Sequence, residues 1–394
     1  MAGTASEGRT TRSAPLLRFV ILYSLLYGSF GVASPYLPAF VETRGLPAEQ
    51  IGFIFAAGTA VRLVAAPLAG RIADHWQAQR LVFAACAVAA AVATLLYLPA
   101  STFGIILLVN LAYAMALAPL TPLADALAVV AANRPRRGFE YGWVRGSGSA
   151  AFILGSIAAG WSVASFGLAA ILWWQAALLI AAAAVTRLVP ALNAEEPSVS
   201  AVANEGLRTL WHSAAFRRIV LVAALILGSH GMHDTFAMIR WTEAGIAPQV
   251  ASLLWSLAVI AEVVVFFLVG PPLIRRLTPA GSIALAAIVG AVRWAVAAIS
   301  TDVWVLSLIQ PMHGITFALL HLACMQLIAR NVPEDLEATA QAIYSTLGIG
   351  AATALVMLAS GWLFGWLGGA AFALMSLLCL AALPLARGLR TSRN

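Results

Sequence analysis

Gly28-Ser29-Phe30-Gly31 lies in the first long apolar run of the sequence and recurs about 200 residues later as Gly228-Ser229-His230-Gly231. Two further pairs keep nearly the same spacing, Gly70 with Gly270 and Gly160-Trp161 with Gly361-Trp362. Each match alone is weak, but one offset that holds across three pairs of apolar runs indicates two similar halves.

The composition excludes an ordinary water-soluble protein. Of the 394 residues 62% are apolar and only 10% are charged, and the mean hydropathy is +0.91. A soluble domain of this size needs far more charge to cover its surface. The net charge of +7 does not indicate nucleic-acid binding, because the arginines are scattered along the chain at the ends of apolar runs.

A helix that spans a membrane needs about 20 mostly apolar residues. Twelve such runs can be separated, at 16–41, 50–70, 80–99, 103–131, 143–165, 168–188, 217–243, 248–270, 279–300, 303–329, 338–363 and 367–387. We therefore expect an all-α membrane protein with 12 transmembrane helices in two six-helix bundles. The expected organisation is a tail at 1–15, a bundle at 16–188, a linker at 189–216, a bundle at 217–387 and a tail at 388–394.

Arginine placement predicts the orientation of these helices. Most arginines fall on one side of the predicted membrane, and the other side carries Arg44, Glu42, Glu49 and Asp302. The excess of positive charge places both termini and the linker in the cytoplasm. The first apolar run is longer than the core of a signal peptide, so we expect it to be a first membrane helix and not a cleaved leader. We expect a multi-pass protein of the bacterial cytoplasmic (inner) membrane.

The sequence contains no pattern typical of an enzyme or a metal site. Cys86, Cys324 and Cys379 lie inside apolar runs, without the spacing of metal ligands. No nucleophile and base have a recognisable spacing. We expect no enzyme activity, no metal and no cofactor.

Ionisable residues inside membrane helices are costly and usually functional. Six of them stand out, namely Arg62, Asp125, Arg145, Asp234, Glu262 and Arg293. The repeat pairs Arg62 with Glu262, since each lies eight residues before its repeated glycine, and it pairs Asp125 with His321. Members of each pair are expected at similar depths in the membrane.

Glu262 is the first candidate for a proton-coupling group. Apolar surroundings disfavour a carboxylate anion, so this group could load a proton outside and release it inside. We expect Arg293, His321 and Asp234 to take part in the same coupling. His230 and Asp234 are four residues apart, hence on one helix face, and a relay or a structural pair would both fit. The alternative for Glu262 and Arg293 is a fixed ion pair that holds helices together.

Arg62 is the best candidate for binding an anion, because a guanidinium holds a carboxylate with two hydrogen bonds. Tyr27, Trp255, Phe236 and His230 are expected to line the substrate site with it. Plain packing is the alternative for the aromatic residues, and a permanent pair with Asp125 or Asp234 is the alternative for Arg62.

Asp125 and Arg145 are expected near the cytoplasmic ends of their helices, where they would form a gate or a structural clamp. Asp74 lies in the short loop that begins Gly70-Arg71-Ile72-Ala73-Asp74. This loop resembles, in degenerate form, the signature between helices 2 and 3 of the major facilitator superfamily. That superfamily consists of two six-helix repeats with a site near the midplane between them.

Several longer stretches resemble the 3-phenylpropionate (hydrocinnamate) permease family of that superfamily. They include Pro119-Leu-Thr-Pro-Leu-Ala-Asp125, Tyr141-Gly-Trp-Val-Arg145, Val292-Arg293-Trp294 and His313-Gly-Ile-Thr-Phe317. The resemblance implies proton-driven uptake of a small aromatic carboxylate. The order of charges is also similar to the lactose permease type of sugar symporter, which supports proton symport more than it supports a sugar substrate.

Other functions stay open. A proton-coupled sugar or nucleoside symporter, or a drug or organic-anion exporter, would have the same fold, while a receptor or scaffold would bind without flux. The expected partners are a small-molecule substrate, protons and the lipid bilayer, with no nucleic acid. We expect a monomer that uses the proton gradient as its energy source.

Overall fold

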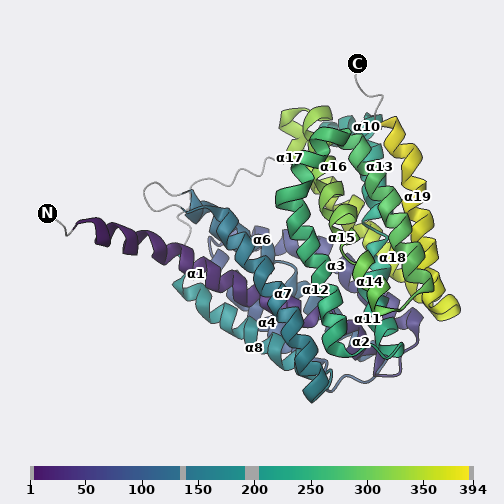
Figure 1. The fold of residues 1–394 in the computed structure, drawn as a ribbon. Coiled ribbons are helices and arrows are strands. Elements are labelled where there is room, and N and C mark those ends of the chain that lie inside the picture. The colour runs from purple at the N-terminus through teal and green to yellow at the C-terminus, as the bar shows by residue number, and fades with distance from the viewer. Residues whose placement is uncertain (1–3, 134–138, 191–203, 390–394) are drawn as a thin grey trace. The chain divides into compact units, whose positions relative to one another are not determined.

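A computed structural model describes residues 4–133, 139–190 and 204–389, and in these ranges every regular element is helical (Figure 1). Ten of the described helical stretches are long and apolar enough to cross a membrane. Two of the ten, Pro248–Ile299 and Glu334–Gly388, have 52 and 55 residues, so each is long enough to cross twice. The expected all-α fold with twelve crossings is therefore consistent with the structure.

The described residues of the first half form eight α-helices. They are α1 (Thr4–Ala33), α2 (Leu37–Glu42), α3 (Ala48–His75), α4 (Gln79–Leu96), α5 (Phe103–Leu117), α6 (Leu120–Ala132), α7 (Tyr141–Phe166) and α8 (Ala170–Val185). α5 and α6 form one crossing that is interrupted next to Pro119, a residue that has no N–H group to donate within a helix.

The second half is more broken. Its α-helices are α9 (Asn204–His212), α10 (Ala214–Ile226), α11 (His230–Glu243), α12 (Pro248–Val264), α13 (Gly270–Ile299), α14 (Val303–Ile309), α15 (Met312–Gly314), α16 (Leu320–Asn331), α17 (Glu337–Ile343), α18 (Ala352–Leu367) and α19 (Phe372–Gly388). Three π-helical segments interrupt its crossings, η2 (Val265–Val269), η3 (Ile315–Leu319) and η5 (Tyr344–Ala351). The described part of the first half has no π-helical segment.

Two backbone breaks divide the two longest helical stretches. Thr278 has a φ of 66° inside α13, and Gly368 has a φ of 54° directly after α18. The helix predicted at 248–270 therefore continues past Gly270 and ends at the break before Pro279. A proline after a non-helical residue is a common way to begin a new helix.

The chain forms two compact units. Unit 1 consists of residues 1–40 and 61–198, and unit 2 consists of residues 41–60 and 199–394. The beginning of α3 thus belongs to unit 2, where Gly52 lies against Gly361 of α18: a Cβ on Gly52 would be 2.7 Å from the Gly361 Cα. Residues 191–203, within the predicted linker at 189–216, lie outside the described residues, as do the outer parts of the two predicted tails.

The repeat seen in the sequence has a structural basis. Ser29 and Ser229 each donate a hydrogen bond of 2.6 Å to the carbonyl three residues earlier, Leu26 and Ile226 respectively. Gly231 packs so tightly on α18 that a Cβ would lie 2.9 Å from a backbone oxygen. Gly31 is even closer to the backbone of α7. Each unit therefore uses its repeated glycine for a close helix crossing.

Large apolar side chains are exposed along the spans. Leu154, Trp161 and Trp304 have exposed fractions of 66%, 61% and 81%. In water such an apolar surface would be a liability, whereas in a bilayer the lipid covers it.

Candidate functional site

A fully buried arginine is at the centre of the candidate site in unit 2. Arg293, on the second part of α13, is 0% exposed. Its NH1 lies 3.3 Å from His313 Nδ1, and its NH2 donates to Gln310 Oε1 over 3.2 Å. The guanidinium also lies 4.3 Å from the centre of the Trp294 ring. A buried cation is costly unless other groups compensate its charge, so these contacts are essential to its placement.

One arm leads from Arg293 to Glu262. His313 of α15 has its other nitrogen, Nε2, 3.4 Å from Glu262 Oε2 on α12. The side chain of Glu262 is 28% exposed, so the carboxylate is at the margin of the unit and not in its core.

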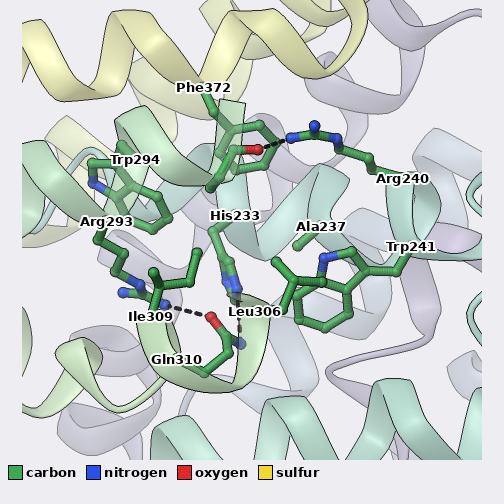
Figure 2. Close-up of a pocket in the computed structure, with 11 residues that line it drawn as sticks. His233, Ala237, Arg240, Trp241, Arg293, Trp294, Leu306, Ile309, Gln310 and Phe372 are labelled. Carbon is green, nitrogen blue, oxygen red and sulfur yellow. Dashed lines mark hydrogen bonds between the residues drawn. The ribbon is translucent and has the colours of Figure 1, made fainter. Parts of the chain in front are cut away.

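A second arm leads from Arg293 to Asp234. Gln310 Nε2 lies 3.4 Å from His233 Nε2 and donates to the Leu254 carbonyl over 3.2 Å. His233 Nδ1 lies 3.6 Å from Asp234 Oδ1, and the Asp234 side chain is 45% exposed. Figure 2 shows the inner part of this arm, with Arg293, Gln310 and His233 joined in sequence. We call Glu262, His313, Arg293, Gln310, His233 and Asp234 together the charged network.

Aromatic rings surround the charged network. His233 is stacked on Trp255 with 4.9 Å between the ring centres. His230 packs against His313 at 5.0 Å and against Trp294 at 5.4 Å, and its Nε2 is buried without a hydrogen-bond partner. These rings exclude water from the inner network, and exclusion of water strengthens the electrostatic interactions there.

Two of the π-helical segments directly follow the charged network. η2 begins three residues after Glu262, and η3 begins two residues after His313. Phe266 in η2 packs against His321, with 6.0 Å between ring centres, and His321 Nδ1 lies 3.2 Å from Tyr344 Oη. π-helical turns inside α-helices are frequent at functional sites.

A small cavity lies beside the charged network (Figure 2). It has room for about 10 Å³ and is lined by Arg293, Gln310 and His233 together with Arg240 and Phe372. This volume suits about one water molecule and no organic substrate. Arg240 donates to the Ala297 and Ala298 carbonyls at the end of α13, so its charge stabilises that helix terminus.

In unit 1 the predicted pair Asp125 and Arg145 lies around the same tyrosines, and among the described residues no ion pair joins the two side chains. Asp125 Oδ1 accepts hydrogen bonds from Tyr23 at 2.5 Å and from Tyr141 at 2.7 Å. The Arg145 guanidinium lies over the ring of Tyr27, 4.7 Å from its centre. Asp125 thus has two tyrosine donors, and the expected gate or structural clamp stays a prediction.

Unit 1 also contains a polar network that sequence reasoning missed. Tyr97 donates to Asn110 over 2.8 Å, Gln175 donates to Tyr113 over 2.8 Å, and Thr94 donates to Gln175 over 3.3 Å. All five side chains are buried and none is charged. We call Thr94, Tyr97, Asn110, Tyr113 and Gln175 the neutral network.

The neutral and charged networks occupy equivalent positions of the repeat. Asn110 and Gln310 are 200 residues apart, as are Tyr113 and His313, and Thr94 and Arg293 are 199 apart. This offset was available in the sequence, and Asn110 and Gln310 stand out there as polar residues in apolar runs, but the sequence does not show which side chains they bond to.

The remaining sequence predictions have different outcomes. Arg62 is exposed on α3, where its charge acts on Tyr97 and Tyr113, and it makes no ion pair with Asp125. Phe236 is fully buried and stacked on Phe364 at 4.6 Å, so it packs the core in this structure and does not line an open site.

The predicted pairing of His230 with Asp234 is replaced by a contact with the adjacent His233. The His230 ring packs in the aromatic cluster around Trp294. Asp74 is exposed and accepts a hydrogen bond of 3.3 Å from Gln79, a local contact at the end of α3.

The chain matches a protein-family model and is similar in sequence to known transport proteins. The sequence model of the MFS_1 like family matches residues 16–374. A protein of Escherichia coli (strain K12) named probable 3-phenylpropionic acid transporter is 31% identical over 92% of this chain and 94% of its own. The maltose permease of Geobacillus stearothermophilus is 27% identical over 91% of this chain and 90% of its own.

Among solved structures, the nucleoside transporter NupG has the same fold. It superposes with a TM-score of 0.84, covers 96% of this chain and 99% of its own, and is 17% identical in sequence.

Proposed function

Since the chain belongs to the MFS_1 like family of major facilitator transporters, we propose that it is a proton-coupled symporter that takes up a small aromatic carboxylate such as 3-phenylpropionate. The observation that carries the substrate class is the 31% identity, over nearly the full length, to a transporter with that compound in its name. The observation that supports proton coupling is the chain of contacts from Glu262 through His313 to the buried Arg293.

Glu262 is the proposed proton carrier. It lies at the edge of an apolar unit and is partly exposed, while His313 contacts its carboxylate. Protonation removes the charge of Glu262, and neutrality favours movement through low-dielectric surroundings. Arg293 is the fixed counter-charge that favours release of the proton.

Arg62 is the proposed carboxylate-binding group. Its guanidinium is exposed and engages no acid of its own unit, which leaves its donors available to a substrate. A carboxylate that binds there receives two parallel hydrogen bonds, an arrangement that lysine cannot reproduce. Tyr27 and Trp255 are the proposed aromatic contacts of the ring.

Transport is proposed to follow alternating access, in which two similar helical units rock about a site near the membrane midplane. The proton gradient supplies the energy, and no cofactor takes part. The proposed location is the bacterial cytoplasmic membrane, with both termini in the cytoplasm and the monomer as the working unit.

The test is uptake of labelled 3-phenylpropionate into proteoliposomes that hold the purified protein and an imposed inward proton gradient. We expect uptake above the gradient-free level, and we expect an uncoupler to abolish it. Uptake that is unchanged by the uncoupler would contradict proton coupling while leaving the substrate class in place.

A sugar is the second candidate, because a relative of 27% identity is named maltose permease. The same vesicles should therefore be tested with maltose and with a nucleoside. Accumulation of either one, without accumulation of 3-phenylpropionate, would replace the proposed substrate class and retain the coupling assay.

A further inference from the structure

The donor and the acceptor of each hydrogen bond in the charged network can be assigned. The orientation of the Gln310 amide assigns them in the Asp234 arm. The Leu254 carbonyl can only accept, so the Gln310 atom 3.2 Å from it must be the amide nitrogen. The amide oxygen of Gln310 then faces Arg293 NH2, which can only donate. The orientation of this amide is therefore settled by its neighbours.

The same amide nitrogen fixes the tautomer of His233. Gln310 Nε2 lies 3.4 Å from His233 Nε2, so that ring nitrogen must accept. A neutral imidazole that accepts at Nε2 carries its proton at Nδ1. His233 Nδ1 is the atom that faces Asp234.

His313 is fixed in the opposite tautomer. Arginine has no acceptor, so His313 Nδ1 must accept from Arg293 NH1. The ring proton is then on Nε2, which faces Glu262. A second proton on either ring would place two N–H groups against each other, so both rings are neutral while the network is intact.

The charge count of the network follows from these tautomers. Two carboxylates terminate the arms, and one guanidinium is at the centre. The charge of Asp234 acts on the Arg293 guanidinium, and Glu262 reaches it through His313. Other ionisable groups around the network are Arg240, which lines the same small cavity, His230, beside His313, and Cys379, whose Sγ is 3.6 Å from Ser229 Oγ. His321, the next histidine along the chain from His313, is close enough to interact electrostatically with Glu262.

We propose that Glu262 and Asp234 are one coupled pair of carboxylates that share the charge of Arg293, and that Gln310 is the positioning residue that joins the Asp234 arm to it. This inference rests on the proposed function for its role in transport. One proton on either carboxylate balances the network against the single guanidinium. The proton is held by a carboxylate and is not retained on a histidine.

The first test reads the tautomers directly and needs no substrate. The full-length protein, labelled with ¹⁵N in histidine and placed in lipid bilayers, is studied by magnetic resonance, with His233→Gln and His313→Gln variants to assign the signals. We expect the wild-type His233 to carry its proton at Nδ1 and His313 to carry its proton at Nε2. Either ring in the opposite tautomer, or doubly protonated at neutral pH, would overturn the proposal.

Two Gln310 variants separate the arms. Gln310→Glu keeps an acceptor for Arg293 but, when ionised, has no donor for His233, while Gln310→Leu removes both. In Gln310→Glu we expect His233 to take up a second proton at Nε2, because a carboxylate oxygen then faces that nitrogen, while His313 keeps its signal. In Gln310→Leu we expect His233 Nε2 to lose its hydrogen bond, which shifts its ¹⁵N signal. The matched control is Gln175→Leu, which removes a buried amide of the neutral network and should leave both histidine signals unchanged. A His233 signal that is the same as wild type in both Gln310 variants would refute the role of Gln310.

The functional arm of the test uses the pH profile of uptake. Asp234→Asn removes one of the two anions that share Arg293, so Glu262 keeps its proton less readily. The midpoint of uptake against pH should therefore move to lower pH. Combined with Gln310→Leu, the same substitution should move the midpoint by less than half as much, because the arm is already broken.

An unmoved midpoint in Asp234→Asn would contradict the coupling. A protein that fails to transport 3-phenylpropionate at all would contradict only the proposed function, because the tautomers are measured without it.

Discussion

The neutral network of unit 1 and the charged network of unit 2 are placed alike in the repeat and differ in chemistry. The neutral network consists of uncharged, buried side chains: Thr94 contacts Gln175, and Gln175 donates to Tyr113. The charged network is open, because each of its arms ends on a partly exposed carboxylate. A polar core that is fully satisfied makes a structure rigid, whereas one that ends at an ionisable group can respond to a proton.

The π-helical segments follow the same division. All three that the described residues contain are in unit 2, and two of them directly follow the residues of one arm. The comparison teaches that both units use glycine crossings, and that among the described residues the π-helical backbone and a connected chain of ionisable side chains occur in unit 2.

The largest expected effect comes from removing the central cation. Arg293→Met should abolish accumulation of substrate and lower the free energy of unfolding by about 3 kcal/mol, since Gln310 and His313 lose their donor. Thermal unfolding in detergent and proteoliposome uptake measure the two effects.

The equivalent substitution in unit 1, Thr94→Val, is the control. It removes the hydroxyl that contacts the Ala90 carbonyl and Gln175, and it should cost about 1 kcal/mol while transport is retained. Equal losses of transport in the two variants would show that the networks do not differ in role.

Glu262→Gln is expected to abolish accumulation against a gradient while exchange of substrate across the membrane continues. The amide keeps the shape of the side chain but cannot release a proton. Counterflow in vesicles without a gradient measures exchange, and uptake with an imposed gradient measures accumulation.

Asp125→Asn, in unit 1, sharpens the comparison because Asn still accepts from Tyr23 and Tyr141. It should keep the uptake of the wild type within about threefold, a difference of less than 1 kcal/mol.

Accumulation of substrate by the Glu262→Gln variant would contradict the assignment of Glu262 as the proton carrier.

Gln175→Leu should destabilise the protein by about 2 kcal/mol, because Tyr113 and Thr94 lose a buried partner. Uptake per folded molecule and its pH midpoint should be unchanged. A displaced pH midpoint would show that the neutral network, too, takes part in coupling.

The last comparison is between two tyrosines that lie 203 residues apart, one in each unit and both outside the two networks. Tyr141→Phe removes a hydrogen bond to a carboxylate, and Tyr344→Phe removes one to a histidine. The first should cost about 2 kcal/mol and the second about 1 kcal/mol, since bonds to charged groups are stronger. The order of their unfolding midpoints checks this prediction, and a reversed order would contradict it.

Much of the fold could be predicted from the sequence. The apolar runs and the repeated glycines indicate twelve helices in two halves, and the structure shows why, since Gly31 and Gly231 sit at close crossings. Glu262 and Arg293 could also be selected, because a charge in an apolar run is conspicuous.

The contacts of the site could not be predicted in the same way. A sequence gives the depth of a residue but not the rotation of its helix, so the pairing of Asp234 with His233 was not foreseen. Gln310 carries no charge, and nothing in its apolar run marks it as the link between two arms. The π-helical turns arise from packing between helices and leave no recognisable residue pattern.

The π-helical turns of η2 and η3 each contain an extra residue relative to an α-helical turn. The position of such a wide turn can shift along the helix by an exchange of backbone hydrogen bonds, without unfolding the helix. When the wide turn shifts past a residue, the side chain of that residue rotates by about 100° about the helix axis. Glu262 and His313 each stand beside such a turn, so a small exchange of backbone hydrogen bonds is enough to swing one away from the other.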